Sequence, residues 1–178
     1  PINTRYKGDE AAFILRKTGA KVLLTVRDFL GHDYPALLQQ AEDPPDPLTI
    51  LLTGNPEGEE LSWEMALELA NKFSEAEVQA RTAGVDGETT ADILFTSGTT
   101  GTPKGAICTH AQDLRAYRDW ADVVGLRADD RYLVVAPFFH AFGYKAGWLA
   151  ALMVGATVIP QPVFDVAAVC KRIGPDRV

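Results

Sequence analysis

The sequence is poor in the residues that build metal sites and disulfide frameworks. Its 178 residues include two cysteines and three histidines, and Cys108 and Cys170 stand far apart with no metal-ligand spacing around either. This pattern disfavours a zinc motif and a small disulfide-stapled fold. We therefore expect both cysteines to be small core residues of a protein in a reducing compartment, the cytoplasm.

Long apolar runs and excess positive charge are also lacking. The most apolar stretch, residues 146–159, is too short to cross a bilayer and contains Gly147 and Gly155, so no integral membrane segment is expected. Lys and Arg total 17 against 24 Asp and Glu, and the formal net charge of -7 disfavours loose electrostatic binding to nucleic acid or anionic lipid. An anionic ligand must therefore be held by local groups.

The remaining sequence alternates short apolar runs with amphipathic stretches. Helices are expected at 8–18, 34–42, 62–73, 110–124, 144–154 and 165–173, and strands at 21–26, 48–53, 93–95, 106–109, 131–136 and 156–159. The polar stretch 74–90 gives no clear prediction. This rhythm of strands and helices predicts an α/β fold with a mainly parallel sheet covered by helices on both faces.

Two charged residues in the expected helices lie near apolar neighbours. In helix 110–124 the spacing of Leu114, Tyr117 and Trp120 predicts an apolar face, and Asp113 is expected to point toward solvent. Lys145 is the one charge for some distance in an apolar helix. We expect its side chain to extend to solvent, with contact to an anionic ligand as the less favoured alternative.

A polar loop separates the expected strands 93–95 and 106–109. Residues 96–105 read Thr-Ser-Gly-Thr-Thr-Gly-Thr-Pro-Lys-Gly, in which small residues let backbone N–H groups approach a polyphosphate while hydroxyls and Lys104 add donors. The loop is not a Walker A motif, because Thr102 and Pro103 separate Gly101 from the lysine. Composition alone favours a flexible surface turn. The position between two apolar strands instead favours a phosphate-binding loop.

This loop resembles that of the adenylate-forming superfamily, which includes acyl-CoA synthetases, luciferases and peptide-synthetase adenylation domains. The shared pattern, Thr-Ser-Gly-Thr-Thr-Gly-x-Pro-Lys-Gly, matches at all ten positions, and residues 1–5 and 14–16 look like the segment after the first core motif of these enzymes. The resemblance implies that the loop holds the β- and γ-phosphates of ATP and then pyrophosphate, with Lys104 also catalytic. The implied binding residues are Thr96, Ser97, Gly98, Thr99, Thr100, Gly101 and Lys104.

A second motif, Pro-Phe-Phe-His-Ala-Phe-Gly at 137–143, follows an expected strand. His140 thus sits where ligands collect in open α/β sheets, although a histidine among aromatics is more often a core residue. The resemblance implies that His140 is the active-site histidine that contacts the substrate carboxylate and the adenylate. Phe139, Phe142, Tyr144 and Trp148 are candidates for an apolar acyl pocket, with core packing as the alternative.

The resemblance implies a ligase that uses ATP and Mg²⁺ to activate a carboxylic acid and passes the acyl group to coenzyme A. The acyl-CoA synthetase branch is favoured, including members that act on fatty acids and steroid-derived propionates, because no Asp for an α-amino group appears. The chain would be part of an N-terminal domain, divided at 1–90 and 91–178, without the C-terminal catalytic domain, and inactive alone. No metal ligand is assigned. A carrier-protein-loading adenylation domain and a non-catalytic nucleotide-binding module are the alternatives.

Overall fold

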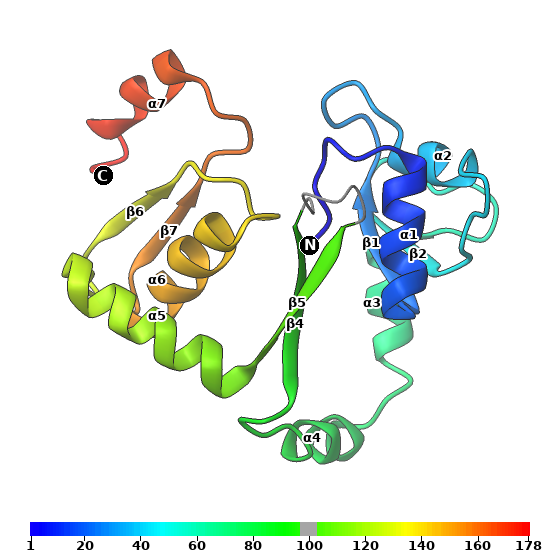
Figure 1. Cartoon of the computed structure of the whole chain (residues 1–178), viewed down its shortest axis with the longest axis horizontal. Coiled ribbons are helices and arrows are strands. Elements are labelled where there is room, and N and C mark those ends of the chain that lie inside the picture. The colour runs from blue at the N-terminus through cyan, green and yellow to red at the C-terminus, as the bar shows by residue number, and fades with distance from the viewer. Residues whose placement is uncertain (97–102) are drawn as a thin grey trace. The chain divides into compact units, whose positions relative to one another are not determined.

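The computed structural model describes residues 1–96 and 103–178, which divide into two compact units (Figure 1). One unit comprises residues 2–85, and the other comprises residues 86–178 together with Pro1. Within these described ranges, none of the helices combines the length and apolarity needed to cross a membrane.

The unit of residues 2–85 is built on a three-stranded parallel sheet in the order β1-β2-β3. Its strands are β1 (Val22–Val26), β2 (Leu48–Thr53) and β3 (Leu61–Ser62), and its helices are α1 (Gly8–Thr18), α2 (Tyr34–Gln39), α3 (Trp63–Ala70) and α4 (Glu75–Ala83). Strands β1 and β2 are short runs of Val, Leu, Ile and Thr, the residues that fit a pleated surface. Ser62 is the N-cap of α3, because the Met65 amide donates to Ser62 Oγ at 3.2 Å.

The core of this unit lies between α1 and α2, where Ala12, Leu15, Leu38 and Ala41 form a buried cluster. The two helices approach closely at Gly8, because a β-carbon there would lie 2.0 Å from the carbonyl oxygen of Leu37. Small residues on the facing surfaces therefore determine how tightly the helices pack.

The second unit begins with an antiparallel hairpin of β4 (Thr90–Thr96) and β5 (Lys104–Thr109). The register of the hairpin shifts between Thr90 and Asp92. Phe95 lies opposite Gly105, and a β-carbon on this glycine would lie 3.1 Å from the Phe95 ring. Glycine at this position therefore leaves room for the aromatic ring across the strand.

The hairpin leads into α5 (His110–Val124), which Figure 1 shows in yellow-green directly after β5. A parallel pair follows, formed by β6 (Arg131–Val134) and β7 (Thr157–Pro160). Between these strands the chain forms a π-helix, η1 (Phe142–Leu149), which continues into α6 (Ala150–Val154), and α7 (Val166–Ile173) comes last. Contacts of α5 with η1 and α6, and of η1 with β6, hold the unit together.

The expected α/β class with mainly parallel sheets is confirmed. Pairing among the described residues is divided among three sheets, and the hairpin β4–β5 is the antiparallel one. Helix α2 ends earlier than expected, at Gln39, and the expected helix 144–154 begins at Phe142 with π-helical geometry. Helix α4 fills part of the stretch 74–90, where no element was predicted.

Candidate functional site

The end of the hairpin carries two of the predicted phosphate-binding residues. Thr96 closes β4 and Lys104 opens β5, and the two are register partners with exposed side chains. Both ends of the predicted phosphate loop are thereby brought side by side. The other predicted residues of the loop, Ser97, Gly98, Thr99, Thr100 and Gly101, lie outside the described residues.

His140 ends a tight turn between β6 and η1. Its backbone amide donates to the carbonyl of Pro137 at 3.1 Å, and its own carbonyl accepts from the amide of Tyr144 at 3.0 Å. The amide of Phe142 donates to His140 Nδ1 at 3.2 Å, and the residue is exposed. Because Nδ1 accepts this hydrogen bond, the ring proton lies on Nε2, which makes Nε2 a donor for an anionic oxygen.

Two glycines allow η1 to pack against the end of β6. A β-carbon on Gly143 would lie 2.3 Å from the carbonyl oxygen of Ala136, and one on Gly147 would lie 2.7 Å from a methyl group of Val134. Any larger residue at Gly143 would therefore push against the turn that carries His140. This close backbone approach is the physical reason for glycine at the end of the motif 137–143.

The prediction that Lys145 and Asp113 reach solvent is wrong. Lys145 is 2% exposed, and its ammonium binds Asp113 Oδ1 at 2.7 Å and Asp92 Oδ2 at 3.0 Å. The side chains of Asp113 and Asp92 are 10% and 7% exposed. Three buried charged groups from η1, α5 and β4 thus compensate one another, which replaces the hydration that each loses.

The electrostatics of this cluster follow from burial and close charges. Burial raises the pKa of Asp92 and outweighs the opposing effect of Lys145, while Asp113 adds to the rise. Burial by itself lowers the pKa of Lys145, but hydrogen bonds to Asp113 and Asp92 outweigh it and raise that pKa above its ordinary value. Asp92 Oδ1 is buried without a hydrogen-bond partner in the described part of the chain.

Aromatic side chains gather around η1 in two pairs. Trp120 of α5 meets Phe142 edge to face with ring centroids 5.6 Å apart, and Tyr144 stacks on Trp148 at 5.6 Å and 15°. Burial raises the pKa of the Tyr144 hydroxyl. Three of the predicted pocket residues therefore contact other aromatic rings, and Trp120, which the sequence placed on the apolar face of its helix, joins them.

The residues predicted for catalysis are not joined by direct contacts. Within residues 1–96 and 103–178, no hydrogen bond or ion pair links His140 to Thr96 or Lys104. The same ranges contain no group of three or more His, Cys, Asp or Glu side chains that would hold a metal ion. The carboxylates of Asp92 and Asp113 both bind the ammonium of Lys145, which supplies the positive charge between them.

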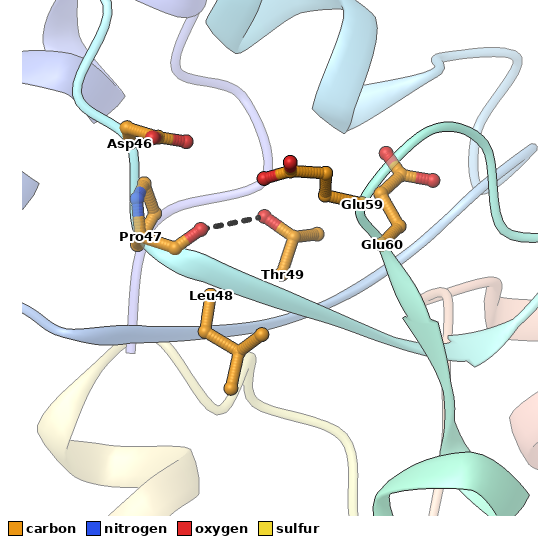
Figure 2. A pocket seen from close by; sticks show the side chains of 6 residues that line it. All are labelled: Asp46, Pro47, Leu48, Thr49, Glu59 and Glu60. Carbon is orange, nitrogen blue, oxygen red and sulfur yellow. Dashed lines mark hydrogen bonds between the residues drawn. The ribbon is translucent and has the colours of Figure 1, made fainter.

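A cavity of about 280 Å³ lies in the other unit, at the start of β2 and before β3 (Figure 2). Its described lining consists of Asp46, Pro47, Leu48, Thr49, Glu59 and Glu60. Glu60 also binds Arg27 at 2.5 Å, and Arg27 contacts Asp33. Acidic side chains around this cavity disfavour an anion, so it is not a candidate for the triphosphate of ATP.

Comparison with known proteins identifies relatives along the whole chain. Two ligases named 3-[(3aS,4S,7aS)-7a-methyl-1,5-dioxo-octahydro-1H-inden-4-yl]propanoyl:CoA ligase are similar: that of Mycobacterium tuberculosis is 43% identical and that of Rhodococcus jostii is 38% identical. Both alignments cover 100% of this chain but 34% and 36% of the relatives. The chain therefore spans about a third of the length of these relatives.

A solved structure shows the same fold. The crystal structure of the anthranilate CoA ligase AuaEII in complex with anthranoyl-AMP matches with a TM-score of 0.79 and 28% identity, over 98% of this chain and 32% of that one. The family model described as AMP-binding enzyme matches residues 1–176, almost the entire sequence. On this evidence the chain belongs to the family of AMP-binding enzymes.

Proposed function

We propose that the natural protein containing this chain is an AMP-forming acid–thiol ligase. In the first step, a carboxylate oxygen attacks the α-phosphorus of ATP, and the bond from this phosphorus to the β-phosphate oxygen breaks to release pyrophosphate. In the second step, the thiol of coenzyme A attacks the acyl carbonyl, and AMP leaves. Family membership and the CoA-ligase relatives over the whole chain support this proposal.

The observation that carries the proposal is the hairpin that bears the motif 96–105. Thr96 and Lys104 face each other across the ends of β4 and β5, so the two ends of the motif lie side by side. Attack of a carboxylate on ATP brings two anions together and expels a third. Fixed N–H donors, hydroxyls and the Lys104 ammonium would stabilise this charge where it develops.

His140 is proposed to hold the reacting carboxylate and the adenylate formed from it. The bond from the Phe142 amide to Nδ1 orients the ring and leaves Nε2–H as the donor. A neutral N–H donor stabilises an anionic oxygen without transferring its proton. Its location at the end of β6 also fits the general placement of ligands at the carboxyl ends of parallel strands.

The proposed acid has a bulky alicyclic body and a propanoate arm. The two relatives at 43% and 38% identity are named for such an acid, and the aromatic pairs Trp120–Phe142 and Tyr144–Trp148 offer apolar surface in the same unit as His140. The acid would carry no α-amino group. ATP is proposed to be used with Mg²⁺.

Acid-dependent exchange of labelled pyrophosphate into ATP tests the first step in the natural protein. We expect exchange with the bicyclic propanoate and a loss of about a hundredfold or more in Lys104→Ala, because a charged donor at the leaving group is removed. Lys72→Ala, which alters an exposed lysine between α3 and α4, is the matched control. A protein without exchange for any acid in a panel of alicyclic, fatty and aromatic acids would contradict the proposal.

The acceptor is tested separately by product analysis. We expect acyl-CoA from acid, ATP and coenzyme A, and no comparable transfer to a phosphopantetheinyl carrier protein. Transfer only to the carrier would overturn the choice of coenzyme A, while exchange of pyrophosphate would still support acid activation.

A further inference from the structure

The buried ammonium of Lys145 connects three elements of the unit 86–178. It lies on η1 and binds Asp113 of α5 at 2.7 Å and Asp92 of β4 at 3.0 Å. The side chains of the three residues are 2%, 10% and 7% exposed. Water therefore competes little for these contacts, and each depends on the exact placement of its element.

Two of the connected elements carry or directly follow residues proposed for the reaction. Asp92 stands four residues before Thr96 on β4, the strand that leads into the phosphate loop, directly after a shift in the strand register. Lys145 stands five residues after His140, on the helix whose amide at Phe142 holds the histidine ring. One ammonium thus joins β4, which carries Thr96, to η1, the helix that follows His140.

A gain in stability does not by itself explain such a cluster. Desolvation of buried ions largely offsets their attraction, and apolar side chains of similar volume often stabilise a fold as well. An ammonium has directed N–H donors, and each bond to a carboxylate fixes an orientation as well as a distance. Apolar packing lets two elements slide against each other, whereas the contacts of Lys145 with Asp92 and Asp113 resist such sliding.

We propose that Lys145 is a positioning residue that holds the phosphate-loop strand β4 in register with the π-helix next to His140. The inference rests on the proposed function. Misplacement of reacting groups by about 1 Å lowers the rate by up to a hundredfold, so loss of this link should lower kcat for acyl-adenylate formation more than it alters KM for ATP. Lys145 itself touches neither substrate nor adenylate in this role.

The test compares Asp92→Asn with Asp92→Leu in the natural protein. Both variants leave one buried ammonium and one carboxylate, Asp113, so the buried charges balance in each. The asparagine carbonyl still accepts a hydrogen bond from Lys145, whereas leucine fills a similar volume without an acceptor. We expect both to unfold at similar temperatures, with wild-type exchange kinetics for Asp92→Asn and a kcat about tenfold or more lower for Asp92→Leu.

The pair Asp113→Asn and Asp113→Leu, measured in the same way, separates positioning from packing on the α5 side. The inference would be overturned if Asp92→Leu folds and keeps the wild-type kcat. It would also be overturned if Asp92→Asn lowers kcat as much as Asp92→Leu does. Failure of both leucine variants to fold would assign the cluster to stability alone and would overturn it too. Absence of exchange in the wild-type protein would instead refute the proposed function, and this inference with it.

Discussion

Asp92 is a buried carboxyl beside a second carboxyl, and its ionisation affects stability. Burial raises its pKa in the folded protein, with Lys145 opposing the rise and Asp113 adding to it. Burial raises the pKa of the Tyr117 and Tyr144 hydroxyls, and the charges of Asp92 and Asp113 add to the rise while Lys145 opposes it. The folded protein therefore retains the Asp92 proton to a higher pH than the unfolded chain does.

This difference predicts how stability changes with pH. The unfolded carboxyl titrates near about 3.9, so the contribution of Asp92 is fully present below that pH and is lost as the pH rises through the higher folded pKa. Urea unfolding of the wild type and Asp92→Asn between pH 4 and 7 should show the wild type losing stability relative to the variant. Asp129→Asn, at an exposed position, should follow the wild type. If the stability of the wild type relative to Asp92→Asn stays constant or increases as the pH rises, the raised pKa is contradicted.

His140 offers a second prediction, because its two ring nitrogens have different partners. Asparagine can keep an acceptor for the Phe142 amide but has no donor at the position of Nε2. His140→Asn should therefore fold like the wild type and form acyl-adenylate about a hundredfold more slowly in single turnover. His32→Asn serves as the control. Unchanged adenylation by His140→Asn would refute the proposed role of the distal N–H.

Among the helices and strands, η1 is the element whose form depends most on its neighbours. Gly143 and Gly147 lie against Ala136 and Val134, so the helix begins directly at the end of β6. π-Helical geometry is rare in proteins as a whole, and where it occurs it is often at a functional site. Here it lies between the turn of His140 and α6, and it carries Lys145 into the protein interior.

Addition of a single methyl group tests this packing. Gly143→Ala places a β-carbon against the carbonyl of Ala136 and should cost about 1–3 kcal/mol or more of unfolding free energy, because backbone must move. Acyl-adenylate formation should fall further, since the turn of His140 shifts. Gly174→Ala meets open space at a φ of -70° and should stay within about 0.5 kcal/mol of the wild type. Equal stability of the two variants would contradict the close approach at Gly143.

Helix α4 depends on local interactions instead, because none of its residues is buried. Ser74 and Glu77 form a capping box, with the Ser74 amide donating to Glu77 Oε2 at 2.8 Å. Ser74→Ala should weaken the helix by about 1 kcal/mol, whereas Ser74→Asp keeps an acceptor for the first turn. Hydrogen exchange at the amides of Glu77 and Val78 should accelerate in the alanine variant alone. Equal acceleration in both variants would argue against the cap.

For the molecule as a whole, much apolar surface remains exposed on the β1–β2 pair. Val22 lies opposite Leu48, and these residues and Leu24 are each about half exposed, at 48%, 45% and 55%. Parallel sheets normally have both faces covered, and contiguous apolar patches of this kind mark contact surfaces.

The 178-residue chain made alone should therefore bind an apolar dye and self-associate. Replacement of Leu24 and Leu48 by Lys should reduce both effects, because charges on this face oppose burial. Val123→Lys, which alters an 84% exposed residue of α5, should leave dye binding unchanged. Light scattering measures self-association, and dye fluorescence measures dye binding. If neither changes in the double variant, the exposed surface of β1 and β2 is not the contact surface.

Local patterns predicted much of the fold because local physics controls them. Helices α1 and α5 have the expected bounds, and Gly19 and Gly125 end them with φ values of 61° and 69°, where glycine has no steric cost. Helix α4 was missed because it has no apolar stripe, although its Ser-x-x-Glu capping box was readable. The candidate residues Lys104 and His140 were found through motifs, and their catalytic roles stay predictions.

The sequence by itself determined most of the elements, the family and the motifs, since hydrophobic period, caps and glycine positions act over a few residues. Only the tertiary structure decided that Asp113 and Lys145 are buried. A helical pattern counts a charge as solvent-exposed, yet a carboxylate and an ammonium 32 residues apart can bury each other once η1 packs on α5. Compensation of charge in the interior depends on which partners meet in space, and no local pattern contains that information.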